Sequence, residues 1–261
     1  MPDTASPQAT LRLKPRAWIG VAVFFAYAAW VLGVWLARDI DYLSVSTEAN
    51  LVQAVLQPLS VAALALAGFL AWSGWWRAAL FDAPRLRHPV YLALLLAAML
   101  GMIGFNLAQT DWVLITARHL AVLVASVLLI GFCEEMVTRG VLLVSLRGEG
   151  RTEMQAWFWS SALFGLLHAT NAFFGLGVLA LAQVLLAFCM GTGFYLLRRL
   201  GGTLLLPMLA HAAWDFSSFT AQLSGAGTPP AKIALMIVTY MLPLLLLAFI
   251  ALRQARRDAG V

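Results

Sequence analysis

The sequence predicts an all-α membrane protein, a polytopic bundle of about eight transmembrane helices with its N- and C-termini in the cytoplasm. Three observations predict this fold class. Of the 261 residues, 62% are hydrophobic and only 11% are charged, with a mean hydropathy of +0.86, whereas soluble domains carry about 25% charged residues. The apolar residues are gathered in runs of roughly 20, the length of a membrane-spanning helix. The Lys and Arg residues are distributed unevenly between the segments that join these runs.

The apolar runs give the predicted spans in order. They lie at 17–37, 51–72, 89–108, 113–147, 155–174, 176–197, 203–221 and 233–252. The first is long enough to be a retained helix rather than the core of a signal peptide. The fourth exceeds the length of a straight span, so we expect it to bend or to leave the bilayer at its end. The predicted organisation is a cytoplasmic tail (1–16), a transmembrane domain (17–252) and a second cytoplasmic tail (253–261).

The basic residues orient these spans. With the N-terminus in the cytoplasm, thirteen Lys and Arg residues fall in inside segments and three in outside segments. The inside residues are Arg12, Lys14, Arg16, Arg77, Arg85, Arg87, Arg147, Arg151, Arg198, Arg199, Arg253, Arg256 and Arg257, and the outside residues are Arg38, Arg118 and Lys232. The asymmetry follows the positive-inside rule. The net charge of +5 does not indicate a nucleic-acid partner, because the basic residues are scattered between apolar runs.

Several other classes of site are disfavoured by the sequence. Cys133 and Cys189 both lie inside apolar runs, so we expect neither a disulfide nor a thiol metal site. No histidine is followed by glutamate, and no serine lies in a Gly-x-Ser-x-Gly motif. The zinc protease helix and the serine hydrolase turn are therefore both missing from the sequence.

Polar side chains interrupt three of the predicted spans. They are Glu134, Glu135 and Arg139 on the fourth, His168 on the fifth, and His211 and Asp215 on the seventh. Ionisable residues at bilayer depth are costly and mark a functional site by default. Counted from the cytoplasmic ends at 1.5 Å per residue, Glu134, His168 and Asp215 lie about 20 Å deep, and His211 about 14 Å. Three helices far apart in sequence are thus expected to bring acids and histidines to a similar level.

The spacing within two of these helices indicates which side chains meet. Glu135 and Arg139 are four residues apart, so they share a helix face and can neutralise each other. Glu134 is rotated by about 100° from Glu135 and is freer to face a cavity. Phe164 and His168 are also four residues apart, which lets the ring pack against the imidazole.

The residue types indicate hydrolysis. A carboxylate and an imidazole in an apolar cavity that admits one water form a general base. His211 and Asp215 share one face of the seventh span, where a histidine with a hydrogen-bonding partner can stabilise an oxyanion. Alternatively, Glu134, His168, His211 and Asp215 can together hold a divalent metal such as zinc. The residue types alone leave both roles open.

Taken in chain order, the motifs resemble a known signature. Glu134-Glu135-x-x-x-Arg139, Phe164-x-x-x-His168 and His211-x-x-x-Asp215 are similar to the three motifs of the CAAX-processing and bacteriocin-processing (CPBP, or Abi) intramembrane proteases. That family includes the Ras-converting CAAX endopeptidase. The resemblance covers roughly residues 120–220.

The resemblance implies a role for each motif. Glu134 and His168 would activate the attacking water, and His211 and the residue at position 215 would bind the oxyanion. Supporting roles fall to Glu135, Arg139 and Phe164. Family members often have Asn at the position of Asp215, and an ionised Asp cannot donate to an oxyanion. Asp215 is therefore protonated, orients His211, or ligates a metal; we favour the metal-free, glutamate-type mechanism, with a zinc metalloprotease as the alternative.

The expected function is that of an intramembrane endopeptidase. It would cleave a membrane-associated protein or peptide, by CAAX-type C-terminal processing or a bacterial equivalent, in the bacterial cytoplasmic (inner) membrane. Two other readings remain open. In a proton-coupled carrier, Glu134, His168 and Asp215 would form a proton relay, and a non-catalytic scaffold or immunity protein would retain the same residues without using them.

Overall fold

The computed structural model describes residues 11–82, 86 and 88–258. Residues 1–10 and 259–261 of the predicted tails, and the inside arginines Arg85 and Arg87, lie outside the described residues. Throughout the described part the chain is helical, and its only extended pairing is an isolated antiparallel bridge between Phe81 and Thr203. The predicted all-α class is confirmed.

The elements follow one another in the order below. They are α1 (Ala17–Ala37), η1 (Tyr42–Ser44), α2 (Glu48–Asn50), η2 (Leu51–Leu56), α3 (Gln57–Ser73), α4 (Trp76–Leu80), α5 (Pro89–Ala108), η3 (Trp112–Leu114), α6 (Ala117–Glu135), η4 (Met136–Leu142), α7 (Leu143–Gly148), α8 (Glu153–Leu167), η5 (His168–Phe174), α9 (Leu179–Gly201), α10 (Leu205–Leu223) and α11 (Pro230–Asp258).

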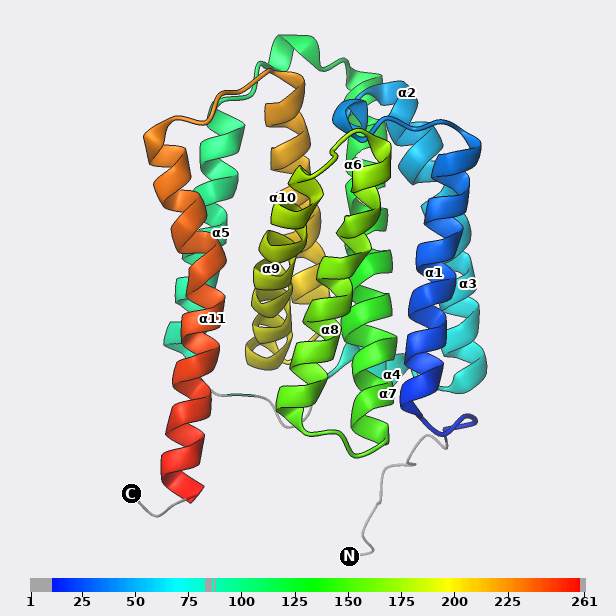
Figure 1. Cartoon of the computed structure of the whole chain (residues 1–261), viewed down its shortest axis with the longest axis vertical. Coiled ribbons are helices and arrows are strands. Elements are labelled where there is room, and N and C mark those ends of the chain that lie inside the picture. Colours follow the sequence, from blue (N-terminus) through cyan, green and yellow to red (C-terminus); the bar gives the residue numbers. More distant parts are fainter. Residues whose placement is uncertain (1–10, 83–85, 87, 259–261) are drawn as a thin grey trace, which may run out of the picture.

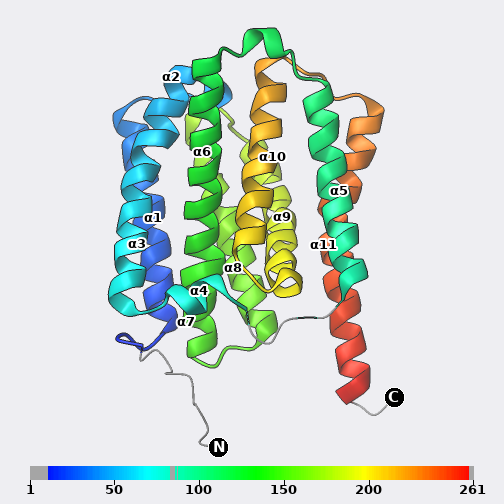
Figure 2. The ribbon, with the colours of Figure 1, turned by 180° about the vertical axis from the view of Figure 1, so that it is seen from behind.

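The long helices form one bundle. Helices α6, α8, α9 and α10 lie at its centre, with α1 and α3 on one flank and α5 and α11 on the other (Figures 1 and 2). The first helix starts and the last helix ends at the same end of the bundle (Figure 1). That common end is what the prediction requires of two termini on one side of a membrane.

Six of the described helical segments are long and apolar enough to cross a membrane. They are Ala17–Ala37, Glu48–Ser73, Pro89–Ala108, Ala117–Gly148, Leu179–Gly201 and Pro230–Arg256. These coincide with six of the predicted spans, so the chain is an integral membrane protein. The two other predicted spans correspond to α8 and α10. Helix α8 has 15 residues, which makes it about 22 Å long, shorter than a hydrocarbon core of about 30 Å. Helix α10 contains several polar residues, which lower its mean hydropathy. The count of eight stays a prediction.

Two predicted spans depart from a straight α-helix. The fourth runs continuously from α6 into α7, and its middle, η4, is a π-helix of seven residues. The fifth was expected to run to residue 174, but α8 ends at Leu167 and gives way to the 3-10 turns of η5. Gly175 then takes a positive φ of 99°, a conformation that glycine adopts without steric cost. Both departures occur beside predicted site residues.

Capping residues fix the starts of two of the central helices that carry predicted site residues, α6 and α8. The Thr116 hydroxyl accepts a hydrogen bond from the His119 amide at the start of α6. At the start of α8, Thr152 and Gln155 form a reciprocal capping box. Such caps satisfy amide groups that the first helical turn leaves unpaired. They fix the register of α6 and α8, and so the heights of the residues further along.

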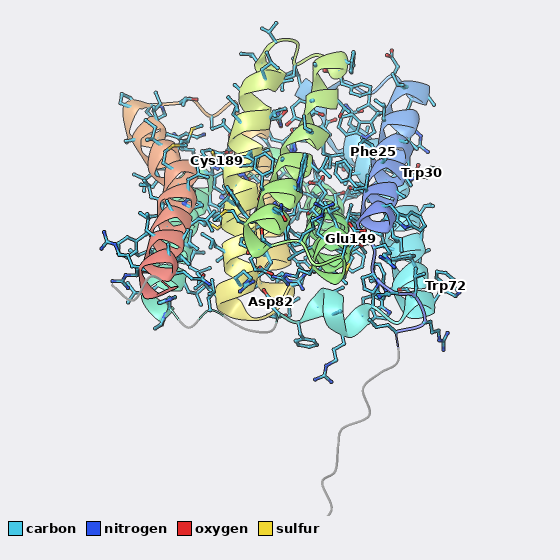
Figure 3. The ribbon with its side chains drawn as sticks, turned by 60° about the horizontal axis from the view of Figure 1, so that its bottom comes forward. Phe25, Trp30, Trp72, Asp82, Glu149 and Cys189 are labelled. Carbon is cyan, nitrogen blue, oxygen red and sulfur yellow. The ribbon has the colours of Figure 1, made fainter. Side chains whose placement is uncertain are left out.

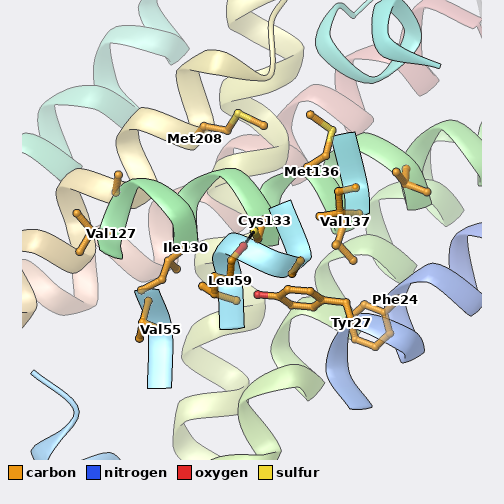
Figure 4. Packing of buried hydrophobic residues seen from close by; sticks show 14 of the residues in the cluster. Phe24, Tyr27, Val55, Leu59, Val127, Ile130, Cys133, Met136, Val137 and Met208 are labelled. Atoms are coloured by element: carbon orange, nitrogen blue, oxygen red, sulfur yellow. Dashed lines mark hydrogen bonds between the residues drawn. The ribbon is translucent and has the colours of Figure 1, made fainter. Parts of the chain in front are cut away.

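Two pairs of central helices, α6 with α10 and α8 with α9, cross closely at a glycine. A Cβ at Gly131 of α6 would lie 2.4 Å from the Met208 carbonyl oxygen of α10. A Cβ at Gly165 of α8 would lie 2.8 Å from the Val184 carbonyl oxygen of α9. Small residues allow membrane helices to approach this closely. Figure 4 shows the adjoining apolar cluster, in which α6, α1 and α3 pack around the buried Cys133, whose thiol donates to the Leu59 carbonyl at 3.5 Å.

The end of the bundle that holds the start of α1 carries an ion-pair network. Arg147 pairs with Asp82 at 2.9 Å and with Glu153 at 2.7 Å. Arg199 also pairs with both carboxylates. Asp82 and Glu149 lie at this end in Figure 3. The network ties the loop after α4 to α7, α8 and α9.

Candidate active site

The carboxylate of Glu135 is held inside the bundle by Arg139. Arg139 Nη1 donates to Glu135 Oε1 at 2.9 Å and to the Thr138 hydroxyl at 2.9 Å. Both side chains of the Glu135–Arg139 pair are fully buried. This confirms the contact predicted from the four-residue spacing. Because the pair is neutral as a unit, it avoids the cost of an isolated buried charge.

The guanidinium of Arg139 is fixed from a second direction by aromatic rings. Its central carbon lies 4.2 Å from the centroid of the Phe164 ring and 5.7 Å from that of Phe194. Cation–π contacts of this kind are strengthened when the groups are away from water. Gly191 makes room for the arginine, since a Cβ there would lie 2.5 Å from Arg139 Nη2. Arg139 therefore has one position in the bundle.

Three carboxylates lie around the imidazole of His211. Its Nδ1 lies 3.2 Å from Glu135 Oε1 in a hydrogen bond, and because the ion-paired Glu135 accepts, Nδ1 carries the proton. Its Nε2 lies 3.5 Å from Asp215 Oδ2 and 4.0 Å from Glu134 Oε2. The imidazole stacks on Phe194 with ring centroids 4.7 Å apart. The ring is thus oriented with Nε2 toward the two other carboxylates.

His168 is oriented by the backbone. Its Nδ1 lies 3.0 Å from the Phe164 carbonyl oxygen, and a carbonyl only accepts, so Nδ1 is the protonated nitrogen. Nε2 is left with its lone pair. The Phe164 ring meets the His168 ring edge-on at 5.1 Å, as the spacing predicted. His168 begins η5, so the change from α-helix to 3-10 turn occurs at a predicted site residue.

One cavity joins the predicted residues. It has a volume of about 310 Å³, and its lining includes Glu134, His168, His211 and Asp215. Glu134 Oε2 is buried and has no hydrogen-bond partner among the described residues. Glu135 and Arg139 lie behind the wall and do not line the cavity. The structure therefore brings together the four residues predicted to act on substrate and separates them from the supporting pair.

The same four residues are also the alternative metal ligands. Within residues 11–82, 86 and 88–258, no group of three or more His, Cys, Asp or Glu side chains is arranged to hold a metal ion. Asp215 Oδ2 and Glu134 Oε2 lie 3.5 and 4.0 Å from His211 Nε2. No step below depends on a metal at these residues.

The sequence reasoning missed several residues around the cavity. Phe194, which stacks on His211, is one apolar residue among many in α9 and gave no signal. Tyr42, Asn171 and Gln183 line the cavity and are hydrogen-bonded to one another. Gln183 lies in the apolar run LALAQVLLAFC, so a polar residue at membrane depth was a signal that could have found it.

The fold and the site define a polytopic helical membrane protein with a buried cavity of acids and histidines. Residues 116–217 match the family model described as Rce1-like, Type II CAAX prenyl endopeptidase Rce1-like. The matched segment contains all three motifs, which confirms the resemblance to the CAAX protease (CPBP) family inferred from them. This family implies a CAAX-type intramembrane endopeptidase acting on a membrane-associated protein or peptide. Comparison with curated proteins and with solved structures gives no match.

Proposed function

We propose that this protein is a glutamate-type intramembrane endopeptidase. It cleaves a peptide bond of a membrane-associated protein, with Glu134 and His168 activating the water and with His211 and Asp215 at the oxyanion. The chain crosses the cytoplasmic membrane of a bacterium eight times, with both termini in the cytoplasm. The shared end of α1 and α11 (Figure 1) and the basic residues at that end support this orientation.

The observation that carries the proposal is the convergence of four side chains in one cavity of about 310 Å³. Glu134, His168, His211 and Asp215 come from α6, η5 and α10, which are far apart in sequence. In a bundle whose helices are mostly apolar, packing alone gives no reason to gather two acids and two histidines around a hollow. A hydrolytic reaction needs such a group of residues.

The geometry around Glu134 and His168 supports a first step in which they activate the water. The Glu134 carboxylate has a buried oxygen with no described partner, and His168 presents the lone pair of Nε2 because Nδ1–H is bound to the Phe164 carbonyl. A water held between a carboxylate and an imidazole acceptor is oriented with an oxygen lone pair toward the substrate carbonyl. Transfer of its proton to Glu134 makes it a nucleophile. The same carboxyl can then return the proton to the leaving amine.

The second step concerns the oxygen of the tetrahedral intermediate. His211 is anchored through Nδ1–H to Glu135, which Arg139 in turn neutralises. Asp215 lies beside Nε2, where it orients the ring and favours a proton on that nitrogen. A donor fixed in advance at a developing negative charge is the arrangement of an oxyanion hole. Glu135 and Arg139 act through His211 and do not touch the substrate.

Cleavage by the purified full-length protein in liposomes tests this proposal. The substrate panel is a set of fluorogenic peptides ending in Cys-aliphatic-aliphatic-X, each in a farnesylated and an unmodified form. We expect the wild-type protein to cleave members of the panel and Glu134→Ala to cleave none. Glu48→Ala is the matched control, because Glu48 pairs with Arg118 away from the cavity and should leave the rate unchanged.

Two results would reject the proposal. If wild-type protein and Glu134→Ala behave alike on every peptide and in membrane proteomics, the cavity is not proteolytic. Liposomes that carry a pH-sensitive dye would then test the proton-coupled carrier, for which Glu134→Ala should abolish flux. Full biological function in Glu134→Ala, with neither cleavage nor flux in the wild type, would indicate the scaffold or immunity protein.

A further inference from the structure

The cavity contains a second polar cluster that the proposed chemistry does not use. The same cavity that is lined by Glu134, His168, His211 and Asp215 is also lined by Tyr42, Asn171 and Gln183. They come from η1, η5 and α9 and are as much as 141 residues apart in sequence. The rest of the wall around them is largely apolar and aromatic, with Trp35, Val55 and Phe174 among its members.

These three side chains form a directed chain of hydrogen bonds. Asn171 Nδ2 donates to Gln183 Oε1 at 2.9 Å, and Gln183 Nε2 donates to the Tyr42 hydroxyl oxygen. The Tyr42 O–H proton and the Asn171 Oδ1 acceptor have no partner among the described residues. Burial raises the pKa of Tyr42, so its hydroxyl keeps the proton that it can donate. The cluster therefore offers both a donor and an acceptor to a molecule in the cavity.

Local packing does not require this cluster. The contact between η1 and η5 is also held by apolar groups, since the Trp35 ring meets Phe174 edge-on at 5.2 Å and Tyr42 at 6.3 Å. A cluster that only held these elements together would use all of its hydrogen-bond donors and acceptors among its own members. Here part of that capacity is open to the cavity.

The charges around the cavity limit what the cluster can bind. Among the described residues that line it, none is Lys or Arg, and Glu134 and Asp215 are acidic. The cluster itself offers only neutral donors and acceptors, so a phosphate headgroup there would have no Lys or Arg partner. A peptide main chain is neutral and carries one donor and one acceptor per residue. Because the wall of the cavity is largely apolar, the few polar side chains in it have to supply partners for those groups.

We propose that Tyr42, Asn171 and Gln183 form a subsite that hydrogen-bonds the main chain of an extended peptide beside the bond to be cleaved. This inference rests on the proposed function and adds to it the form in which substrate is bound. The amide and hydroxyl groups pair with a main-chain N–H and C=O, while the apolar wall receives neighbouring side chains. Selection is thus for an unfolded, extended segment, because a helix has already paired those groups.

Ester substitution in the substrate tests the subsite directly. The probe is the panel peptide that wild-type protein cleaves fastest, resynthesised with single amides replaced by esters within three residues of the scissile bond. An ester lacks the N–H donor and is a weaker acceptor. We expect one or two positions at which the ester lowers kcat/KM of the wild-type protein roughly tenfold, the effect of one hydrogen bond to a buried group. In Gln183→Met, and in Tyr42→Phe, which keeps the ring, those positions should become insensitive.

Thr170→Val is the matched control. Thr170 also lines the cavity, but its hydroxyl donates to the Leu167 carbonyl at 2.9 Å, so its loss should leave the ester pattern as in the wild type. The inference is overturned if the ester and the side-chain substitutions reduce kcat/KM independently of each other at every position. That result leaves wild-type cleavage intact, whereas failure of the proposed function appears earlier, as the lack of any cleavage that depends on Glu134.

Discussion

The crossing of α6 and α10 at Gly131 sets the geometry of the site, and adding one methyl group there should separate its two halves. A Cβ at Gly131 would lie 2.4 Å from the Met208 carbonyl oxygen and 3.3 Å from the Ala212 backbone nitrogen. Ordinary contacts begin near 3.4 Å, so the helices must move apart by about 1 Å. The nearest atom is a backbone carbonyl oxygen, and the third close atom, Ala212 Cβ at 3.3 Å, is fixed to the backbone, so no side-chain rotation can relieve the overlap.

The displacement falls one helical turn from the reacting groups. Glu134 and Glu135 follow Gly131 on α6, and His211 follows Met208 on α10. The Glu135–His211 hydrogen bond is 3.2 Å long, so a further 1 Å takes it beyond hydrogen-bonding distance. We expect Gly131→Ala to destabilise the protein by about 1–3 kcal/mol, the usual cost of overpacking. A misplacement of about 1 Å costs on the order of 100-fold in catalysis, and we expect kcat to fall by that amount.

The assay compares thermal unfolding in detergent with peptide cleavage at a temperature at which the variant is fully folded. Gly104→Ala is the matched control, because a Cβ at Gly104 on α5 meets nothing within 4 Å. It should match the wild type in both measurements. If Gly131→Ala unfolds at the wild-type temperature and cleaves at the wild-type rate, the α6–α10 contact does not set the position of His211, and the reasoning is wrong.

Three further predictions concern mechanism and topology. Asp215→Asn should keep or raise the cleavage rate, with no effect of chelators, since Asn supplies an amide donor of similar shape; a steep loss that added zinc partly restores would instead indicate a metal ligand. Loss of Glu134 or of His168 should each remove most of the rate, and the double variant should lose little more, because both act on one water; additive losses would show separate roles. Reporter fusions at residues 150 and 225 should report opposite sides of the membrane, and same-side results would contradict the eight-span topology.

The approximate height of the site could be predicted because helix rise is constant. Counting residues from the basic ends brought Glu134, His168 and Asp215 to a similar depth, and the structure places all three around one cavity. The Glu135–Arg139 pair could be predicted for a similar reason, since a spacing of four residues fixes a shared face on any helix. These predictions needed only local geometry.

The contacts between helices could not be predicted in the same way. The bond from His211 to Glu135, rather than to Glu134 alone, depends on the crossing at Gly131 and on the stacking of His211 on Phe194. The early end of α8 at Leu167 was also missed, although the polar residues His168, Thr170 and Asn171 follow it directly. The hydrophobic periodicity of a sequence describes one helix at a time, whereas contacts such as that of His211 with Glu135 form between two helices.

Arg198 shows that arginines counted together as cytoplasmic charges can have different structural roles. It was counted among the cytoplasmic charges, yet it is fully buried, and it donates to the carbonyls of Arg139, Ala78 and Phe81. One acceptor, the Arg139 carbonyl, belongs to the π-helix η4, which directly follows Glu134 and Glu135. An arginine at the end of an apolar helix can therefore remain at the membrane surface or turn inward to satisfy backbone groups of a distorted helix. The charge asymmetry does not depend on Arg198, because the other inside residues still outnumber Arg38, Arg118 and Lys232, so the orientation argument holds while this arginine supports the site.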